Sequence, residues 1–164
     1  MKIRLLVLLL GLVLALIPST AMAATTYTES VRGIETGLPQ SSSACPAPSS
    51  VSPFAGIATG TVIGTFQIAV CHTQLTTSGA TIKSGAFTFS NGTTTVNGAF
   101  TNGGRIFPPM LSVSGAFCIQ TYVVTGGLSP AGHFGGKLTH YGFWTGSACN
   151  VFFATISGSA TLTA

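Results

Sequence analysis

Charged side chains are almost absent from this chain, which has six Lys or Arg and two Glu among 164 residues. No segment longer than ten residues places a charged face opposite an apolar face at helical spacing, as a surface helix requires. Gly, Thr, Ser, Val and Phe dominate instead, in segments that alternate with the period of two that is typical of strands. We therefore predict an all-β fold.

Turn residues divide the chain into closely spaced strands. The expected strands span residues 24–35, 54–71, 81–89, 93–101, 111–125, 133–145 and 149–163. A Pro/Ser-rich connection occupies about residues 37–53, and Asn91-Gly92 marks a hairpin because this dipeptide accepts positive φ angles. Gly-rich residues 126–132 separate two later strands. Short connections of this kind predict an antiparallel meander of about seven or eight strands.

One strand segment also permits a different interpretation. Gly56, Gly60 and Gly64 recur every fourth residue and would form a small-residue face on a transmembrane helix. The segment is rich in Thr and carries Gln67, which favours a strand.

The tetrapeptide Ser/Asn-Gly-Ala-Phe occurs three times and ends at Phe87, Phe100 and Phe117. Residues two apart in a strand share a face, so each Gly points the same way as its Phe. A Gly inside a strand lets the sheet coil sharply, and a large neighbour covers the gap. The repeat predicts a small closed or nearly closed β-barrel with the three Phe side chains inside. A β-sandwich satisfies the same alternation and is the alternative.

The N-terminus has the pattern of an export signal. Lys2 and Arg4 precede an apolar run over residues 5–17, and the small-residue site Ala21-Met22-Ala23 follows. The run has about 13 residues, fewer than the ~20 that span a bilayer. We predict a signal peptide at 1–23, a single secreted all-β domain at 24–164, and no membrane span in the mature chain.

Four cysteines, an even number in an exported chain, predict two disulfides. Of the three possible pairings we favour Cys45 with Cys71 and Cys118 with Cys149. The first bond would fasten the Pro/Ser-rich connection to the first long strand. A zinc site is not expected, because no two cysteines lie within five residues of each other.

Charge composition also restricts the partners. Removal of the signal leaves four basic residues, too few to neutralise the phosphates that nucleic-acid binding relies on. No carboxylate side chain follows Glu35, so Ca²⁺ or Mg²⁺ cages and carboxylate-dependent chemistry are not expected in the body of the domain.

A short stretch, Thr125-Gly126-Gly127 followed by Gly132-His133-Phe134-Gly135-Gly136, resembles the hairpin of dirigent and allene oxide cyclase-type barrels. In those families Thr-Gly-Gly leads into a Gly-x-Phe-x-Gly strand. The match covers about a dozen residues and carries an insertion at 128–131, and the family's acidic pocket residues have no counterpart here. The resemblance implies an eight-stranded barrel with an apolar central cavity. It assigns no catalytic residue.

Reactive side chains are few. The imidazoles are His72, His133 and His140, and the carboxylates are Glu29 and Glu35. A serine triad would need one of these carboxylates to orient a histidine, and no Gly-x-Ser-x-Gly elbow supports it. A three-histidine metal site is not expected, because His133 and His140 are seven apart and point to opposite faces of a regular strand.

The alternation around His140 permits two orientations. His140 shares its parity with Phe134, Leu138 and Trp144, so an interior position would make it a lone polar group in an apolar pocket. In the other orientation Tyr141 and Phe143 face inward and His140 faces water.

Two functions fit these features. The first is a non-enzymatic module that binds a small apolar molecule inside a curved sheet. Its expected pocket residues are Phe87, Phe100, Phe117, His140 and Trp144. The second is a structural protein with a filled core that associates with a cell-surface component or with itself. No catalytic residue, metal or cofactor is predicted, and an enzyme would be limited to chemistry that needs shape rather than acid and base groups. Asn91-Gly92-Thr93 is a glycosylation sequon.

Overall fold

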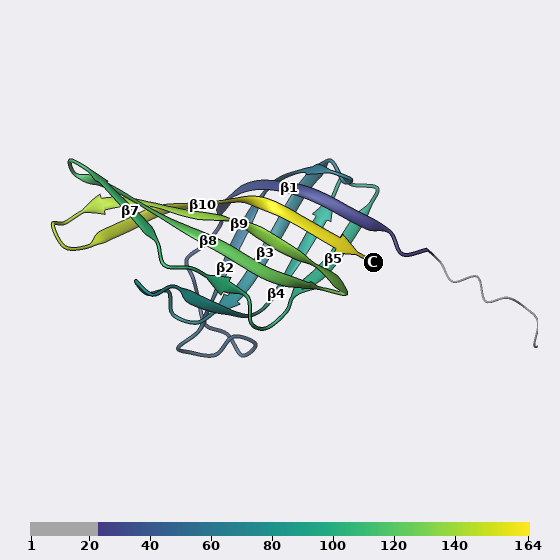
Figure 1. Ribbon diagram of the computed structural model, residues 1–164, viewed down its shortest axis with the longest axis horizontal. Coiled ribbons are helices and arrows are strands. Elements are labelled where there is room, and N and C mark those ends of the chain that lie inside the picture. The colour runs from purple at the N-terminus through teal and green to yellow at the C-terminus, as the bar shows by residue number, and fades with distance from the viewer. Residues whose placement is uncertain (1–22) are drawn as a thin grey trace, which may run out of the picture.

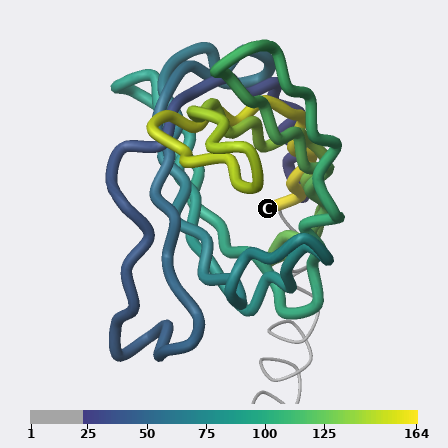
Figure 2. The backbone as a smooth tube through the Cα atoms, turned by 90° about the vertical axis from the view of Figure 1, so that its left-hand side faces the viewer, coloured from purple at the N-terminus to yellow at the C-terminus, as the bar shows by residue number. Residues whose placement is uncertain are grey.

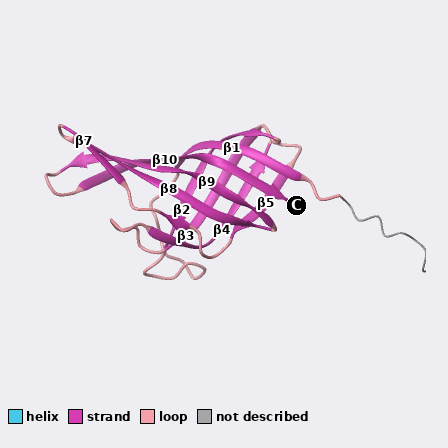
Figure 3. Cartoon of the chain, viewed as in Figure 1, coloured by secondary structure: helices cyan, strands magenta, loops and turns pink. Residues whose placement is uncertain are grey.

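The computed structural model describes residues 23–164, whose regular secondary structure is entirely β (Figure 3). These residues form ten strands: β1 (Thr26–Glu35), β2 (Ser50–Gly60), β3 (Gly64–His72), β4 (Ala80–Ser90), β5 (Thr95–Phe100), β6 (Arg105–Ile106), β7 (Met110–Ser114), β8 (Phe117–Ser129), β9 (Ala131–Trp144) and β10 (Cys149–Thr163). Within this range no helix is long and apolar enough to span a membrane. The predicted signal peptide, residues 1–23, lies outside the described residues except for Ala23.

Eight strands close into an antiparallel barrel, which confirms the predicted barrel and excludes the sandwich. The order around the ring is β3-β2-β1-β10-β9-β8-β5-β4, and β4 pairs with β3 to close it. Figure 2 shows the ring viewed along the long axis of the molecule. The pairing of β5 with β8 is the shortest in the eight-stranded ring, with two residue pairs, and β6 reinforces this seam by pairing with both β4 and β8.

The structure differs most from the prediction in three segments. Residues 54–71 are not one strand, because the chain turns back between Gly60 and Gly64 to form the hairpin of β2 and β3. Residues 111–125 are likewise divided into β7 and β8 by a turn at Gly115, whose φ is +60°. The Gly-rich residues 126–132 do not form a loop and mostly extend β8 and β9, because Gly126 pairs with Phe134 across the two strands. The alternation pattern predicted these segments as strands, but it did not show that the chain reverses between Gly60 and Gly64 and at Gly115.

The Gly-x-Phe repeat behaves as expected in two of its three copies. On paired β4 and β5, Phe87 lies opposite Gly98, and Gly85 lies opposite Phe100. A Cβ on Gly98 would come 2.2 Å from the Phe87 ring, so the ring occupies the space that a side chain would need. The third copy is different, and its expected interior position is wrong. It lies at the turn between β7 and β8, and Phe117 is 57% exposed.

The interior is filled along most of the barrel. Phe100 contacts Phe87 and Phe134 edge to face, with ring centroids 6.0 and 5.8 Å apart. The end of the barrel at the β2–β3 turn is sealed by fully buried side chains, which we call the closed end: Glu29, Val62, Phe66, Phe89 and Leu162. Glu29 is 1% exposed and accepts a 2.7 Å hydrogen bond from the Val62 amide. The closed end therefore holds a carboxyl group among apolar side chains.

Beyond the opposite end of the ring, strands β7 to β10 continue as an arm, formed by residues 110–119 and 141–153 (Figure 1). Strand β7 pairs only with β8. The disulfide between Cys118 and Cys149 joins β8 to β10 within the arm, and the second disulfide joins Cys45 to Cys71 of β3. Both predicted pairings are confirmed, and the Cys45 bond fastens the connection between β1 and β2 beside the ring.

Candidate functional site

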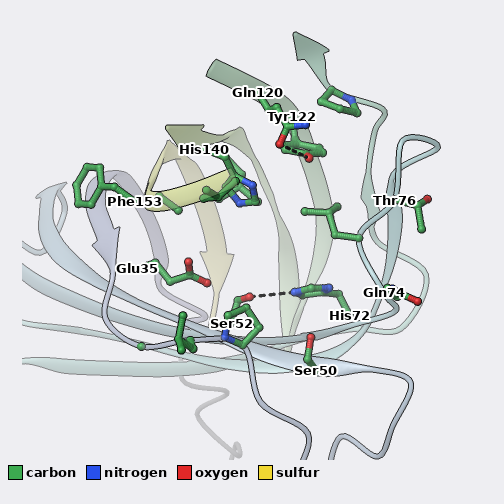
Figure 4. Close-up of a pocket in the computed structure, with 18 of the residues that line it drawn as sticks. Glu35, Ser50, Ser52, His72, Gln74, Thr76, Gln120, Tyr122, His140 and Phe153 are labelled. Atoms are coloured by element: carbon green, nitrogen blue, oxygen red, sulfur yellow. Dashed lines mark hydrogen bonds between the residues drawn. The ribbon is translucent and has the colours of Figure 1, made fainter. Parts of the chain in front are cut away.

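A cavity of about 950 Å³ opens at the end of the barrel nearer the arm (Figure 4). We call this end the mouth. Polar side chains from five strands of the ring line it, among them Glu35, Ser52, His72, Gln120, Tyr122 and His140. The side chains of Leu75, Leu138 and Ala154 form part of the apolar wall of the cavity. The mouth thus combines apolar surface with several hydrogen-bonding groups, which is the usual composition of a small-molecule site.

Strand periodicity explains how these polar groups come together. On β3 the buried positions Phe66, Ile68 and Val70 share the face of His72, so His72 also points inward. Tyr122 and Val124 on β8 are buried on the face that Gln120 shares. The antiparallel pairing of β1 with β2 then brings Glu35, far from the histidines in sequence, to the same cavity.

Ser52 and His72 form a buried side-chain hydrogen bond in the mouth. Both side chains are 6% exposed, and Ser52 Oγ lies 3.0 Å from His72 Nε2. The other ring nitrogen, Nδ1, lies 2.7 Å from the carbonyl oxygen of Thr73. Two hydrogen bonds therefore fix the orientation of the imidazole.

The opposite wall is formed by β8 and β9. Tyr122 meets His140 edge to face, with ring centroids 5.2 Å apart, and its hydroxyl donates a 3.4 Å hydrogen bond to Gln120 Oε1. Figure 4 shows this pair across the cavity from Ser52 and His72. A bound molecule would therefore meet hydrogen-bonding groups on both sides.

Burial shifts the ionisation of three groups in the mouth toward their neutral forms. It raises the pKa of Glu35, an effect that a hydrogen bond with Ser52 partly opposes. It also raises the pKa of Tyr122. Burial lowers the pKa of His140, and repulsion from His72 lowers it further. The mouth is thus suited to uncharged polar groups rather than to ions.

Only one of the five residues predicted to form a ligand pocket lines this cavity. His140 does so and therefore takes the interior orientation, but it is not a lone polar group there, since several other polar side chains line the cavity with it. Phe87 and Phe100 are buried in the filled interior and do not line the mouth. Phe117 is exposed on the arm, and Trp144 is half-buried at the end of β9, where the strand has left the ring.

The same parity argument would have found the residues that the sequence interpretation missed. His133 is exposed and His140 lines the cavity, which confirms that these two residues point to opposite faces. Ser52, however, was assigned to the Pro/Ser-rich connection, although β2 begins at Ser50. His72 lies directly after the predicted strand 54–71, whereas β3 includes it on the face of Phe66, Ile68 and Val70.

No group of three or more His, Cys, Asp or Glu side chains within residues 23–164 is arranged to hold a metal ion. No family model, curated protein or solved structure matches the chain. The resemblance of residues 125–136 to dirigent and allene oxide cyclase-type barrels accordingly stays a prediction.

Proposed function

We propose that this protein is a secreted binding module that takes up a small, uncharged amphipathic molecule in the mouth of its barrel. One observation carries the proposal: a cavity of about 950 Å³, with apolar walls and several polar side chains, lies at the end of an otherwise filled barrel. A purely structural barrel would be expected to fill this end with apolar side chains, as it fills the rest of its interior.

The chemistry of the lining supports an uncharged ligand. Glu35 and His140 both have pKa values shifted toward the neutral form, and the described cavity wall contains no Lys or Arg. Hydroxyl, carbonyl or amide groups of a ligand would pair with Gln120, Tyr122 and His140. Its apolar part would lie against Leu75 and Leu138. The two disulfides and the predicted signal peptide support an extracellular setting.

Solvent extraction of natively secreted protein, followed by mass spectrometry, tests the proposal directly. We expect a copurifying molecule of low polarity that carries one or two hydrogen-bonding groups.

A second experiment measures binding in vitro with the neutral fluorophore N-phenyl-1-naphthylamine. His140→Ala should weaken this binding, whereas His133→Ala, on the outer face of the same strand, should not. Equal effects of the two substitutions would contradict the proposal.

A second function, self-association, has its own support in the arm. Phe117, Phe143 and Phe152 are exposed there. The Phe143 ring contacts both of the others, and its centroid lies 5.5 Å from that of Phe117 and 4.9 Å from that of Phe152. Residues 110–119 and 141–153 contain no Lys, Arg, Asp or Glu. Sedimentation velocity of the wild type and of Phe143→Ser tests this alternative. A monomer at all concentrations would exclude it.

A further inference from the structure

Ser52 and His72 are arranged as a hydroxyl and a base rather than as two unrelated polar residues. They lie inside the barrel on the paired strands β2 and β3, and both line the cavity. The 3.0 Å distance between Ser52 Oγ and His72 Nε2 is within the range of a hydrogen bond (Figure 4).

The direction of this hydrogen bond follows from the neighbouring one. A backbone carbonyl oxygen only accepts, so the 2.7 Å contact with Thr73 requires the proton of the neutral imidazole to be on Nδ1. Nε2 then carries a lone pair, and the Ser52 hydroxyl donates to it. The Thr73 carbonyl thus orients the imidazole, as the acidic residue does in a serine triad.

Glu35 is the second acceptor near the Ser52 hydroxyl. The hydroxyl has a single proton, so the Glu35 carboxylate and His72 Nε2 compete for it. Burial favours the protonated, uncharged form of Glu35, and a neutral carboxyl is a weaker acceptor of the Ser52 proton than a carboxylate. The remaining titratable groups that face this pair across the cavity are His140 and Tyr122.

We propose that Ser52 is a nucleophile and His72 its general base, and that the pair hydrolyses an uncharged ester with an apolar acyl group. This inference rests on the proposed function, because the ester must first bind in the mouth. The apolar walls at Leu75 and Leu138 and the shift of the lining toward neutral forms favour an uncharged substrate.

The reaction balances with water as the second substrate. Ser52 Oγ attacks the ester carbonyl carbon while its proton passes to His72 Nε2, and the bond from that carbon to the alkoxy oxygen breaks. The leaving alkoxide takes the proton from Nε2 and departs as the alcohol. Water then attacks the acylated Ser52 and gives a proton to Nε2. Oγ leaves as the carboxylic acid forms, and it recovers its proton from His72.

The test uses an uncharged alkyl fluorophosphonate, which reacts with activated serine hydroxyls, on the intact disulfide-bonded protein. We expect one adduct in the intact mass, located at Ser52 by peptide sequencing. Ser52→Ala should abolish it, and His72→Gln should slow it at least about 100-fold, the usual contribution of a general base. Ser84→Ala is the control, since Ser84 is an exposed serine on β4 that does not line the cavity. It should label at the wild-type rate.

Circular dichroism and N-phenyl-1-naphthylamine binding on the same variants separate the two proposals. If the fluorophore binds to the wild type and Ser52 is not labelled, the nucleophile assignment is wrong and the binding function stands. Labelling spread over several hydroxyls, or unchanged in a folded His72→Gln, would overturn the assignment as well. If neither the fluorophore nor the fluorophosphonate reaches the mouth, both proposals fail.

Discussion

The filled interior and the mouth are built by the same strands with the same alternation, yet they present opposite chemistry. Along β3 the inward positions Phe66, Ile68 and Val70 are apolar and buried, whereas the next one is His72. Along β9 the inward positions pass from Phe134 and Leu138 to His140. The barrel is thus a packed core over most of its length, with a cavity at one end whose apolar wall carries several polar side chains. The predictions below, given in order of decreasing expected effect, test this division.

Truncation in the filled interior should cause the largest loss of stability. Phe100 is 4% exposed and contacts two other Phe rings, so Phe100→Ala should lower the free energy of unfolding by about 3–5 kcal/mol. Phe117→Ala, on the exposed arm, should change it by less than about 0.5 kcal/mol. Denaturant titration of both variants measures the difference. A loss under 1 kcal/mol for Phe100→Ala would mean that a cavity already exists there.

The two disulfides should differ in what they do to the mouth. Each closes a loop of similar length, with sequence separations of 26 and 31 residues, so removing either should cost about 3–4 kcal/mol on the chain-entropy model. Replacing Cys45 and Cys71 by Ala should also weaken N-phenyl-1-naphthylamine binding, because that bond fastens the connection whose residues 36–39 line the cavity. Replacing Cys118 and Cys149 should leave binding intact. Equal loss of affinity in both double variants would contradict this assignment.

A single methyl group should distinguish a crowded position in the filled interior from an open one. Gly98→Ala places a Cβ against the Phe87 ring and 2.8 Å from the Ser129 carbonyl oxygen, and it should cost about 1–3 kcal/mol. Gly135→Ala meets nothing within 4 Å and should be nearly neutral. Thermal denaturation of the two variants side by side is sufficient, and equal midpoints would refute the crowded packing of Phe87 over Gly98.

The smallest effect should come from pH. Burial raises the pKa of Glu29 at the closed end and of Glu35 at the mouth. The folded state therefore binds protons more tightly than the unfolded state. The stabilisation is fully present below the ordinary carboxyl pKa and is lost as the pH rises through the raised folded values. The pKa of His140 is lowered, so its titration has the opposite effect: it destabilises the folded state as the pH falls.

The double variant Glu29→Gln and Glu35→Gln isolates the carboxyl contribution. The stability of the wild type relative to this variant should fall between pH 4 and pH 7. A difference that stays constant over that range would contradict the raised pKa values.

Most of the barrel was predictable from local sequence, and its exceptions have local causes. The Gly-x-Phe pairs on β4 and β5 indicated curvature correctly, because Phe87 and Phe100 each cover a Gly of the neighbouring strand. The interior position predicted for Phe117 from the same tetrapeptide is wrong, because Gly115 lies in a turn. Periodicity alone does not distinguish a strand from the turn that ends it.

The mouth was less predictable, for a different physical reason. Alternation identifies which side chains point inward, but not whether the space they face is filled or open. Glu35, Ser52 and His140 lie on three strands separated by long stretches of sequence, and only ring closure places them around one cavity.

Nuclear magnetic resonance of the bound fluorophore tests the division between filled interior and mouth most directly. Isotope-labelled protein is titrated with N-phenyl-1-naphthylamine, and the ring signals of His140 and Tyr122 are followed together with those of Phe87 and Phe100. We predict shift changes and direct contacts from the ligand to His140 and Tyr122, with Phe87 and Phe100 unchanged. Contacts to the two Phe rings without contacts to His140 would place the ligand inside the sheet and contradict the account.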